Sequence, residues 1–355
     1  MASIYAFKGF RYNKQKVGDV SSVVTQPYDK IPEALRLDYL DRSPHNIVRV
    51  IKNSDYKEAA DYLNSWISQE VMVQDSQPAI YVYEQVFEFE EKTLTRLGFI
   101  ALVSLDDDDL AVKGHENILN KPLEDRLNLI RSTQANEGLV FTLFSDPDLS
   151  VDRVLEQCSK AQSPVLEVRD DFNVTNRLWE INDPDLIVGI QTLMKGKALY
   201  IADGHHRYQT SVSYHQELLD QGFKPSGVES FDKRMIALFN MDSEGMRILA
   251  THRAVRNVSN LDVNKLLNDL RASFEVTPCE DADMVFTQVD EKEHTIGLVT
   301  ESPRGYYALT LKPGQTEDSD FMPAVSGPSR ELDVCLLHDG ILAPHLGLGP
   351  AEVAS

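Results

Sequence analysis

Residues 198–219 read ALYIADGHHRYQTSVSYHQELL, and the pattern changes abruptly within them. Residues 198–202 form an apolar run with the length and composition of a buried strand. The next residues, Asp203-Gly204-His205-His206-Arg207, are polar and include a glycine suited to a tight turn. From Tyr208 to Leu219, apolar residues recur every three or four positions, which is the spacing of one helix face. The stretch therefore predicts a strand, a tight turn and a helix in succession.

Helical and strand-like patterns alternate along the rest of the chain. Amphipathic spacing predicts helices over residues 32–40, 56–67, 122–135 and 263–274. Aromatic and β-branched runs predict strands over residues 47–51, 80–89, 96–104, 138–144, 235–241, 246–250, 295–299 and 306–311. We expect a mixed α/β (α+β) fold with boundaries near residues 150 and 230. These boundaries define an N-terminal α/β region (1–150), a core that carries the turn (151–230) and a C-terminal α+β region (231–355).

The charge of the chain limits its partners. Lys and Arg total 35 against 56 Asp and Glu, which gives a formal charge of −21. Such a field repels nucleic acid and anionic membrane surfaces, so we expect neither as a partner. A small anionic ligand is still compatible, because a local cluster of donors can bind phosphate in an acidic protein. Three widely separated cysteines and an N-terminus without an apolar leader predict a cytoplasmic protein.

The polar turn at residues 203–207 combines side chains suited to phosphate binding. Backbone N–H groups and the dipole at a helix N-terminus favour an anion, and Gly204 permits close backbone approach. Arg207 offers a planar fork of donors for phosphate oxygens, whereas His205 and His206 can donate hydrogen bonds or relay a proton. The alternative is structural, with Asp203 capping the helix and both histidines facing solvent. A zinc site is disfavoured because adjacent helical histidines point about 100° apart.

Two N-terminal positions are further candidates. Asp29, in the turn Pro27-Tyr28-Asp29, could accept a proton from a substrate hydroxyl or bind magnesium. It could equally cap the helix expected near Pro32. Asn46 precedes the apolar run 47–51 and could either line a substrate pocket or close a turn.

Three later segments offer charged or titratable groups. His115-Glu116 could bring a substrate-binding histidine and a carboxylate that acts as a base or metal ligand. An ordinary surface loop is the alternative. Arg126 is a substrate-binding candidate, but Asp125 and Arg126 are adjacent on one helix, where side chains diverge, so at most one of them points into a site. The alternative role for Arg126 is a structural salt bridge. Arg253 follows a predicted strand and could add positive charge for a phosphate.

The motifs of this chain resemble the bacterial and archaeal family called domain of unknown function 1015. The resemblance runs in the family's order from residue 4 to about 345. It rests on YIADGHHRYQTS together with Pro27-Tyr28-Asp29, Ser43-Pro44-His45-Asn46, His115-Glu116, Asp125-Arg126-Leu127, Ala135-Asn136, Leu178-Trp179 and Thr251-His252-Arg253. Family members usually carry a late MPxKST-like segment, which this sequence does not contain.

The GHHRY segment is similar to the strand-turn-helix signature of the ParB and sulfiredoxin superfamily, which includes kinases of free serine. This resemblance implies a ParB/sulfiredoxin-like nucleotide-binding core with flanking strand-rich regions. It also implies that Gly204, His205, His206 and Arg207 hold the phosphates of ATP or ADP. Asp203 would then orient a histidine or a hydrated Mg²⁺ ion.

Three functions follow as hypotheses from these residues and the resemblance. The first is a nucleotide- and Mg²⁺-dependent phosphotransferase acting on a small hydroxylated metabolite, with free L-serine as the family-derived candidate. Asp29 or Glu116 would accept the hydroxyl proton, and Arg253 would help to neutralise phosphate charge. The second is a phosphoester hydrolase, for example of phosphoserine, that uses His205 or His206 as nucleophile or acid. The third is a non-catalytic sensor of a nucleotide or metabolite.

Overall fold

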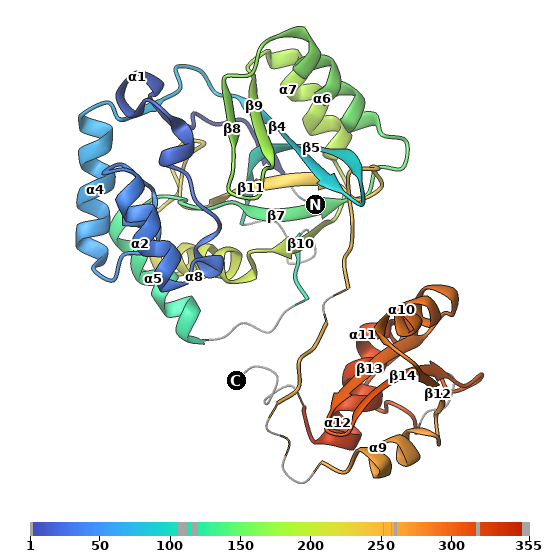
Figure 1. Cartoon of the computed structure of the whole chain (residues 1–355). Coiled ribbons are helices and arrows are strands. Elements are labelled where there is room, and N and C mark those ends of the chain that lie inside the picture. The colour runs from blue at the N-terminus through green and yellow to red at the C-terminus, as the bar shows by residue number, and fades with distance from the viewer. Residues whose placement is uncertain are drawn as a thin grey trace. The chain divides into compact units, whose positions relative to one another are not determined.

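The computed structural model of the chain describes residues 3–105, 112–115, 120–250, 252–256, 258, 261–316 and 320–349 (Figure 1). The chain divides into two compact units, Met1–Leu249 and Ala250–Ser355. The boundaries expected near residues 150 and 230 both fall inside the first unit. The reason is that strands from all three expected regions hydrogen-bond in one sheet.

The first unit is built on a mixed sheet, which has nine strands in the described ranges. These are β1 (Ile4–Tyr5), β4 (Ile80–Phe89), β5 (Lys92–Ser104), β6 (Val112–Lys113), β7 (Val140–Phe144), β8 (Leu166–Arg169), β9 (Thr175–Ile181), β10 (Leu199–Asp203) and β11 (Lys233–Asn240). Their order is β6-β10-β7-β11-β5-β4-β9-β8, and β1 pairs with β5. β7 is parallel to β11 and β6 to β10, whereas the other pairs are antiparallel.

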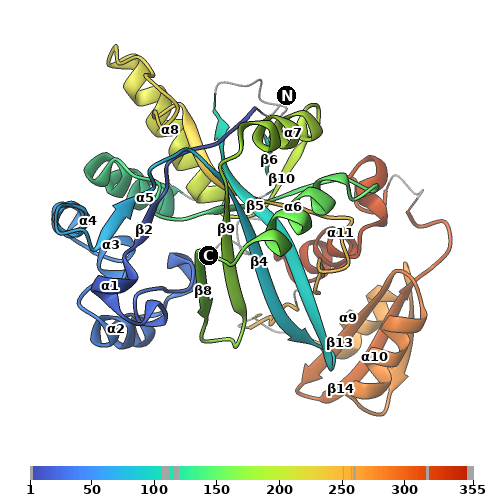
Figure 2. The same ribbon diagram turned by 90° about the horizontal axis from the view of Figure 1, so that it is seen from above.

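Helices pack around this sheet in two groups (Figures 1 and 2). One group, α6 (Ser150–Ala161) and α7 (Pro184–Met194), covers a sheet face and buries Val151, Leu155, Ile190 and Met194 against Val82, Phe99 and Leu238. The other comprises α1 (Lys14–Val17), α2 (Glu33–Arg42), α3 (Val48–Ile51), α4 (Tyr56–Ser68), α5 (Asn120–Thr133) and α8 (His205–Asp220). In this group α5 lies between α4 and α8. A short ribbon of β2 (Phe10–Tyr12) and β3 (Met72–Gln74) completes the unit.

The second unit has its own sheet and core. Its antiparallel sheet, in the order β12-β14-β13, consists of β12 (Phe274–Cys279), β13 (Thr295–Glu301) and β14 (Arg304–Leu311). Its helices include α9 (Val263–Leu270), α10 (Ala282–Glu291), α11 (Asp333–Leu337) and α12 (Ala343–Leu346). Leu266, Leu270, Phe274, Leu309 and Ile341 form the core. The two units together confirm the mixed α/β fold, and no helix of the described ranges is long and apolar enough to cross a bilayer.

Two strand predictions were wrong. Residues 48–51 form α3, because Asn46 Oδ1 accepts a hydrogen bond from Val48 N at 2.9 Å and starts a helical turn. This local bond overrides the β preference of a Val- and Ile-rich run. Residues 246–250 form no strand, and Ile248 is 96% exposed. An apolar run becomes a strand only where a neighbour pairs its backbone, and none of the described strands does so here.

Candidate functional site

The strand-turn-helix predicted from the sequence is present, and Gly204 makes its turn. β10 ends at Asp203 and α8 begins at His205, with Gly204 as the N-cap residue at φ 96° and ψ 27°. This left-handed conformation is one that glycine adopts without steric cost. A Cβ atom at Gly204 would also lie 3.1 Å from Arg207 Cζ. Glycine is therefore required both by the backbone and by the side chain folded over it.

Arg207 is held in place from two sides. Its Nη2 donates to Asp203 Oδ2 at 2.5 Å, and its Nη1 donates to the backbone oxygen of Leu139 at the start of β7. The Asp203 carboxylate therefore pairs with Arg207, and among the described residues no side chain caps the N-terminus of α8. This pairing replaces the capping role that Asp203 could have had. It also fixes the guanidinium at the first turn of a helix.

Two predicted histidines meet beside the turn. The backbone N of His115 donates to Nε2 of His205 at 3.3 Å, and the two rings lie edge to face with centroids 4.5 Å apart. Because Nε2 of His205 accepts this bond, we assign its ring proton to Nδ1. His205 is buried, whereas His206 on the same turn is half-buried. Glu116 lies outside the described residues.

Arg126 lies against the Pro27-Tyr28-Asp29 turn. Its guanidinium carbon is 4.1 Å from the centroid of the Tyr28 ring, and its Nη1 donates to the backbone oxygen of Ile51 at 2.8 Å. The expectation that Asp125 and Arg126 diverge was wrong, since Arg126 Nη2 donates to Asp125 Oδ2 at 2.5 Å. A long arginine side chain can curl back to its neighbour even though their Cα–Cβ bonds diverge.

The phenol of Tyr28 connects Arg126 electrostatically with the turn. Burial raises the pKa of Tyr28, Arg126 and Arg207 act to lower it, and Asp29 acts to raise it. Both arginines are therefore close enough to influence the same phenol. Asp29, the candidate chosen from the sequence, is exposed, whereas its neighbour Tyr28 is half-buried against Arg126.

A third arginine, Arg234 on β11, was not anticipated. Its side chain is buried, and it donates from Nη1 to Asn136 Oδ1 at 2.5 Å and from Nη2 to the backbone oxygen of Gly138. Its Nε is buried and has no partner among the described residues. Burial lowers the pKa of Arg234 to about 10, Glu137 opposes this shift, and Arg207 adds to it. The sequence contained a signal, because two-residue periodicity places Arg234 on the same strand face as Ile236 and Leu238.

Glu137 is the carboxylate whose charge acts to raise the pKa of Arg234. Burial raises its pKa, although a hydrogen bond from Thr133 and the charges of Arg234 and Arg126 act to lower it. Burial thus outweighs the attraction of both arginines.

Two further predicted residues have other partners in the structure. Asn46 is fully buried, and its amide donates to Ser22 O at 2.8 Å while its oxygen accepts from Val48 N. It fixes the start of α3, so its side chain is not available to a substrate. Arg253 belongs to the second unit, where its Nε donates to His338 Nε2 at 3.3 Å.

Comparison with known families bears on this arrangement. The profile described as "Protein of unknown function (DUF1015)" matches residues 4–335. The chain belongs to this DUF1015 family. No curated protein and no solved structure was found to match it. The motifs found in the sequence are therefore those of a family whose description assigns no activity.

The residues of this DUF1015 chain fit a phosphate better than a metal ion. A buried arginine N–H without a described partner and a glycine turn at a helix N-terminus both suit an anion. In contrast, the described residues contain no group of three or more His, Cys, Asp or Glu side chains placed to hold a metal. Asp203, the expected ligand within those ranges, is engaged by Arg207.

Proposed function

We propose that this protein transfers a phosphoryl group between ATP or ADP and a small hydroxylated metabolite, and that the turn Gly204–Arg207 holds the phosphates. The observation that carries the proposal is the way three guanidinium groups are fixed. Arg126, Arg207 and Arg234 each donate to a main-chain carbonyl: Ile51 O, Leu139 O and Gly138 O. A carbonyl orients a guanidinium without cancelling its charge. Arg126 and Arg207 each also pair with one carboxylate, whereas Arg234 has no ion pair among the described residues, so its positive charge stays available for an anion.

The fixed guanidinium groups would act by positioning and by neutralising charge, which supply most of the catalysis in phosphoryl transfer. Arg207 uses two of its five N–H donors in its bonds to Asp203 and Leu139 and keeps others for a phosphate oxygen. Because Arg207 is already immobilised, binding costs little further side-chain entropy. Mg²⁺ would supply the remaining charge neutralisation when it is bound with the nucleotide.

The acceptor and the proton acceptor come from the family resemblance. Free L-serine is the candidate acceptor, and the relation to the ParB and sulfiredoxin superfamily is part of this proposal. Asp29 or Glu116 would take the hydroxyl proton, while His206 would add contacts to the phosphates or the substrate. His115 and His205 would position one another beside the turn through their 3.3 Å hydrogen bond.

One observation favours a sensor as the second candidate. The described residues supply no metal cluster, and Asp203 is paired with Arg207, so the same turn could bind a nucleotide without turnover. A hydrolase that uses His205 as nucleophile is less favoured, since Nε2 of His205 accepts a bond from the His115 backbone and Nδ1 carries the proton.

A phosphorus NMR time course tests the proposal. One sample contains the full chain with Mg²⁺, ATP or ADP and L-serine, and a second contains phosphoserine alone. We expect a new phosphomonoester signal only when nucleotide and serine are both present. Arg207→Ala should abolish that signal, whereas the control Arg131→Ala, which removes an exposed arginine of α5, should leave it.

Three results would redirect the assignment. Inorganic phosphate from phosphoserine alone would favour the hydrolase, and saturable nucleotide binding without any product would favour the sensor. Full transfer activity in Arg207→Ala would contradict the role of the turn.

A further inference from the structure

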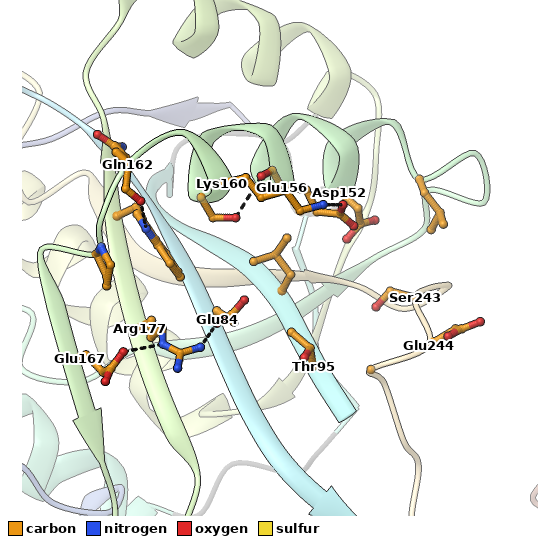
Figure 3. A pocket seen from close by; sticks show the side chains of 16 residues that line it. Glu84, Thr95, Asp152, Glu156, Lys160, Gln162, Glu167, Arg177, Ser243 and Glu244 are labelled. Atoms are coloured by element: carbon orange, nitrogen blue, oxygen red, sulfur yellow. Dashed lines mark hydrogen bonds and ion pairs between the residues drawn. The ribbon is translucent and has the colours of Figure 1, made fainter. Parts of the chain in front are cut away.

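A second site lies at the other end of the strand pair β7 and β11. A cavity of about 660 Å³ lies between α6 and strands β4, β5, β8 and β9, and the loop Ser243–Gly245 lines one side (Figure 3). This volume falls within the roughly 300–1,000 Å³ range of small-molecule sites. On β7, Phe141 pairs with Asp203 of β10, which precedes the turn at residues 203–207. At the other end of β7, Phe144 pairs with Asn240 of β11, whose amide donates to Asp152 in the cavity. About 10 Å of strand, at roughly 3.3 Å per residue, separates the two positions.

The walls of the cavity are acidic. Its lining contains five carboxylates (Glu84, Asp152, Glu156, Glu167 and Glu244) against two cations, Lys160 and Arg177. Asp152, Glu156 and Lys160 are spaced by four, so they share the side of α6 that faces the strands (Figure 3). The acidic lining therefore follows from helix periodicity as well as from the fold.

Both cations are already neutralised by their neighbours. Arg177 on β9 bridges Glu84 on β4 at 2.8 Å and Glu167 on β8 at 2.6 Å, across three paired strands (Figure 3). Lys160 pairs with Glu156 at 2.7 Å. The Arg177 bridges join three strands of the sheet, and the Lys160–Glu156 pair lies along α6, so both are structural contacts. They leave Asp152 and Glu244 without a cationic partner among the described ion pairs.

Asp152 is the group in this cavity that the fold itself does not neutralise. It is 7% exposed, and its only side-chain partner in the described contacts is the amide of Asn240, which donates at 2.6 Å. Burial raises the pKa of Asp152, Asn240 acts to lower it, and Asp146 and Glu156 act to raise it. A buried carboxylate beside two others is costly unless a cation approaches it.

We propose that this cavity binds a small organic cation, of the class that carries an ammonium or guanidinium group on a short methylene chain. The charged head would pair with Asp152, and Glu244 would attract a second positive group at the loop. Leu97, Leu149 and Trp179 give the cavity an apolar wall against which methylene groups can pack. The site does not depend on the phosphotransferase proposal, because none of its lining residues belongs to the turn at residues 203–207.

Calorimetric titration of the full chain with agmatine, which carries a guanidinium and an ammonium group, tests this site. Glutarate, a dianion of similar length, is the matched ligand control. We expect agmatine to bind saturably, with a shift of the Trp179 indole resonance, and glutarate not to bind. Asp152→Asn should weaken agmatine binding at least tenfold. Asp148→Asn, which removes an exposed charge nearby, should leave binding unchanged.

The failing results are equally specific. No saturable agmatine binding, equal binding of glutarate, or equal weakening by Asp148→Asn would each overturn the proposal. If Asp152→Asn fails to fold, Glu244→Gln takes its place, because Glu244 is exposed on a loop and is not needed for the core. Unchanged affinity in Glu244→Gln would then refute the site, and an affinity loss of threefold or more would support it.

Discussion

Gly204→Ala is expected to displace the Arg207 guanidinium and thereby abolish phosphate binding without unfolding the protein. The substitution acts in two ways. It forces a non-glycine residue into a left-handed conformation at φ 96°, and it places a methyl group 3.1 Å from Arg207 Cζ. The first effect strains the backbone, and the second moves the side chain away from Asp203 and Leu139.

The size of both effects can be estimated from the structure. A left-handed conformation costs an alanine about 1–2 kcal/mol. Loss of the Asp203–Arg207 pair adds at most about 1 kcal/mol, because Asp203 is half exposed and solvent screens the pair. One kcal/mol lowers the melting temperature of a domain of this size by about 2–4 °C. The two effects together cost about 1–3 kcal/mol, so we expect the melting temperature to fall by about 2–12 °C.

Gly222→Ala is the matched control at the other end of α8. Gly222 has φ 85°, and a Cβ there would meet nothing within 4 Å. This variant carries the backbone strain alone, so its melting temperature should fall by about 2–8 °C while phosphate binding stays at the wild-type level. Calorimetric melting and titration with inorganic phosphate and ADP measure both quantities on the same samples.

The comparison of the two glycine variants separates the effect of displacing the Arg207 guanidinium from the effect of backbone strain. If Gly204→Ala binds phosphate as the wild type does, the Arg207 guanidinium is not the phosphate ligand. If Gly222→Ala loses binding to the same extent, the loss reflects strain in α8 rather than displacement of the guanidinium.

Stability should respond to pH in opposite ways at two neighbouring aspartates, measured by denaturant unfolding between pH 3 and 8. Burial acts to raise the pKa of Asp146, but hydrogen bonds from Val151 N and Lys197 leave the pKa below its ordinary value of 3.8. The stability that the Asp146 carboxylate contributes is therefore present above pH 3.8 and is lost as the pH falls through the lowered pKa. Asp146→Asn should then cost about 1 kcal/mol at pH 7 and less in acid. Asp152 has a raised pKa, so its contribution to the free energy of unfolding is largest below pH 3.8 and declines as the pH rises. The change in that free energy caused by Asp152→Asn should therefore be more stabilising at pH 7 than at pH 3. Equal pH profiles for the two variants would contradict these assignments. Gly189→Ala, in the exposed middle of α7 with nothing within 4 Å of its Cβ, should raise the melting temperature by about 1–4 °C, and a decrease would count against the helix.

Local patterns in the sequence predicted the elements around the site. The strand-turn-helix appears as β10, Gly204 and α8, since an apolar run, a glycine and a helical repeat depend only on nearby residues. The strands predicted over residues 80–89 and 96–104 are β4 and β5, joined at Glu90 and Glu91 in left-handed conformations.

The contacts that assemble the site are not local, and the sequence did not predict them. His115 and His205 meet across ninety positions, and Arg234 reaches Gly138 from a neighbouring strand. Such pairings depend on strand order, which periodicity does not determine. Nothing in a short motif shows which side chain turns inward. Asn46 was a pocket candidate, but its side chain bonds to the backbone, and Tyr28, which packs against Arg126, was not selected.

Arginines of this acidic protein differ in how many carboxylates they pair with, and the difference supports the proposed site. Arg11, Arg42 and Arg177 each bridge two carboxylates, and each has a raised pKa. Their charge is used up in joining elements of the fold.

Arg126 and Arg207 have one carboxylate partner each in the described contacts, and Arg234 has no ion pair there and a lowered pKa. An acidic chain has ample carboxylates to pair every arginine. A buried arginine without a carboxylate partner costs stability, and such a cost can be tolerated where the arginine binds an anion. On this reasoning Arg234→Met should raise the free energy of unfolding while weakening phosphate binding. A variant that loses stability and keeps its affinity would show that Arg234 serves the fold alone.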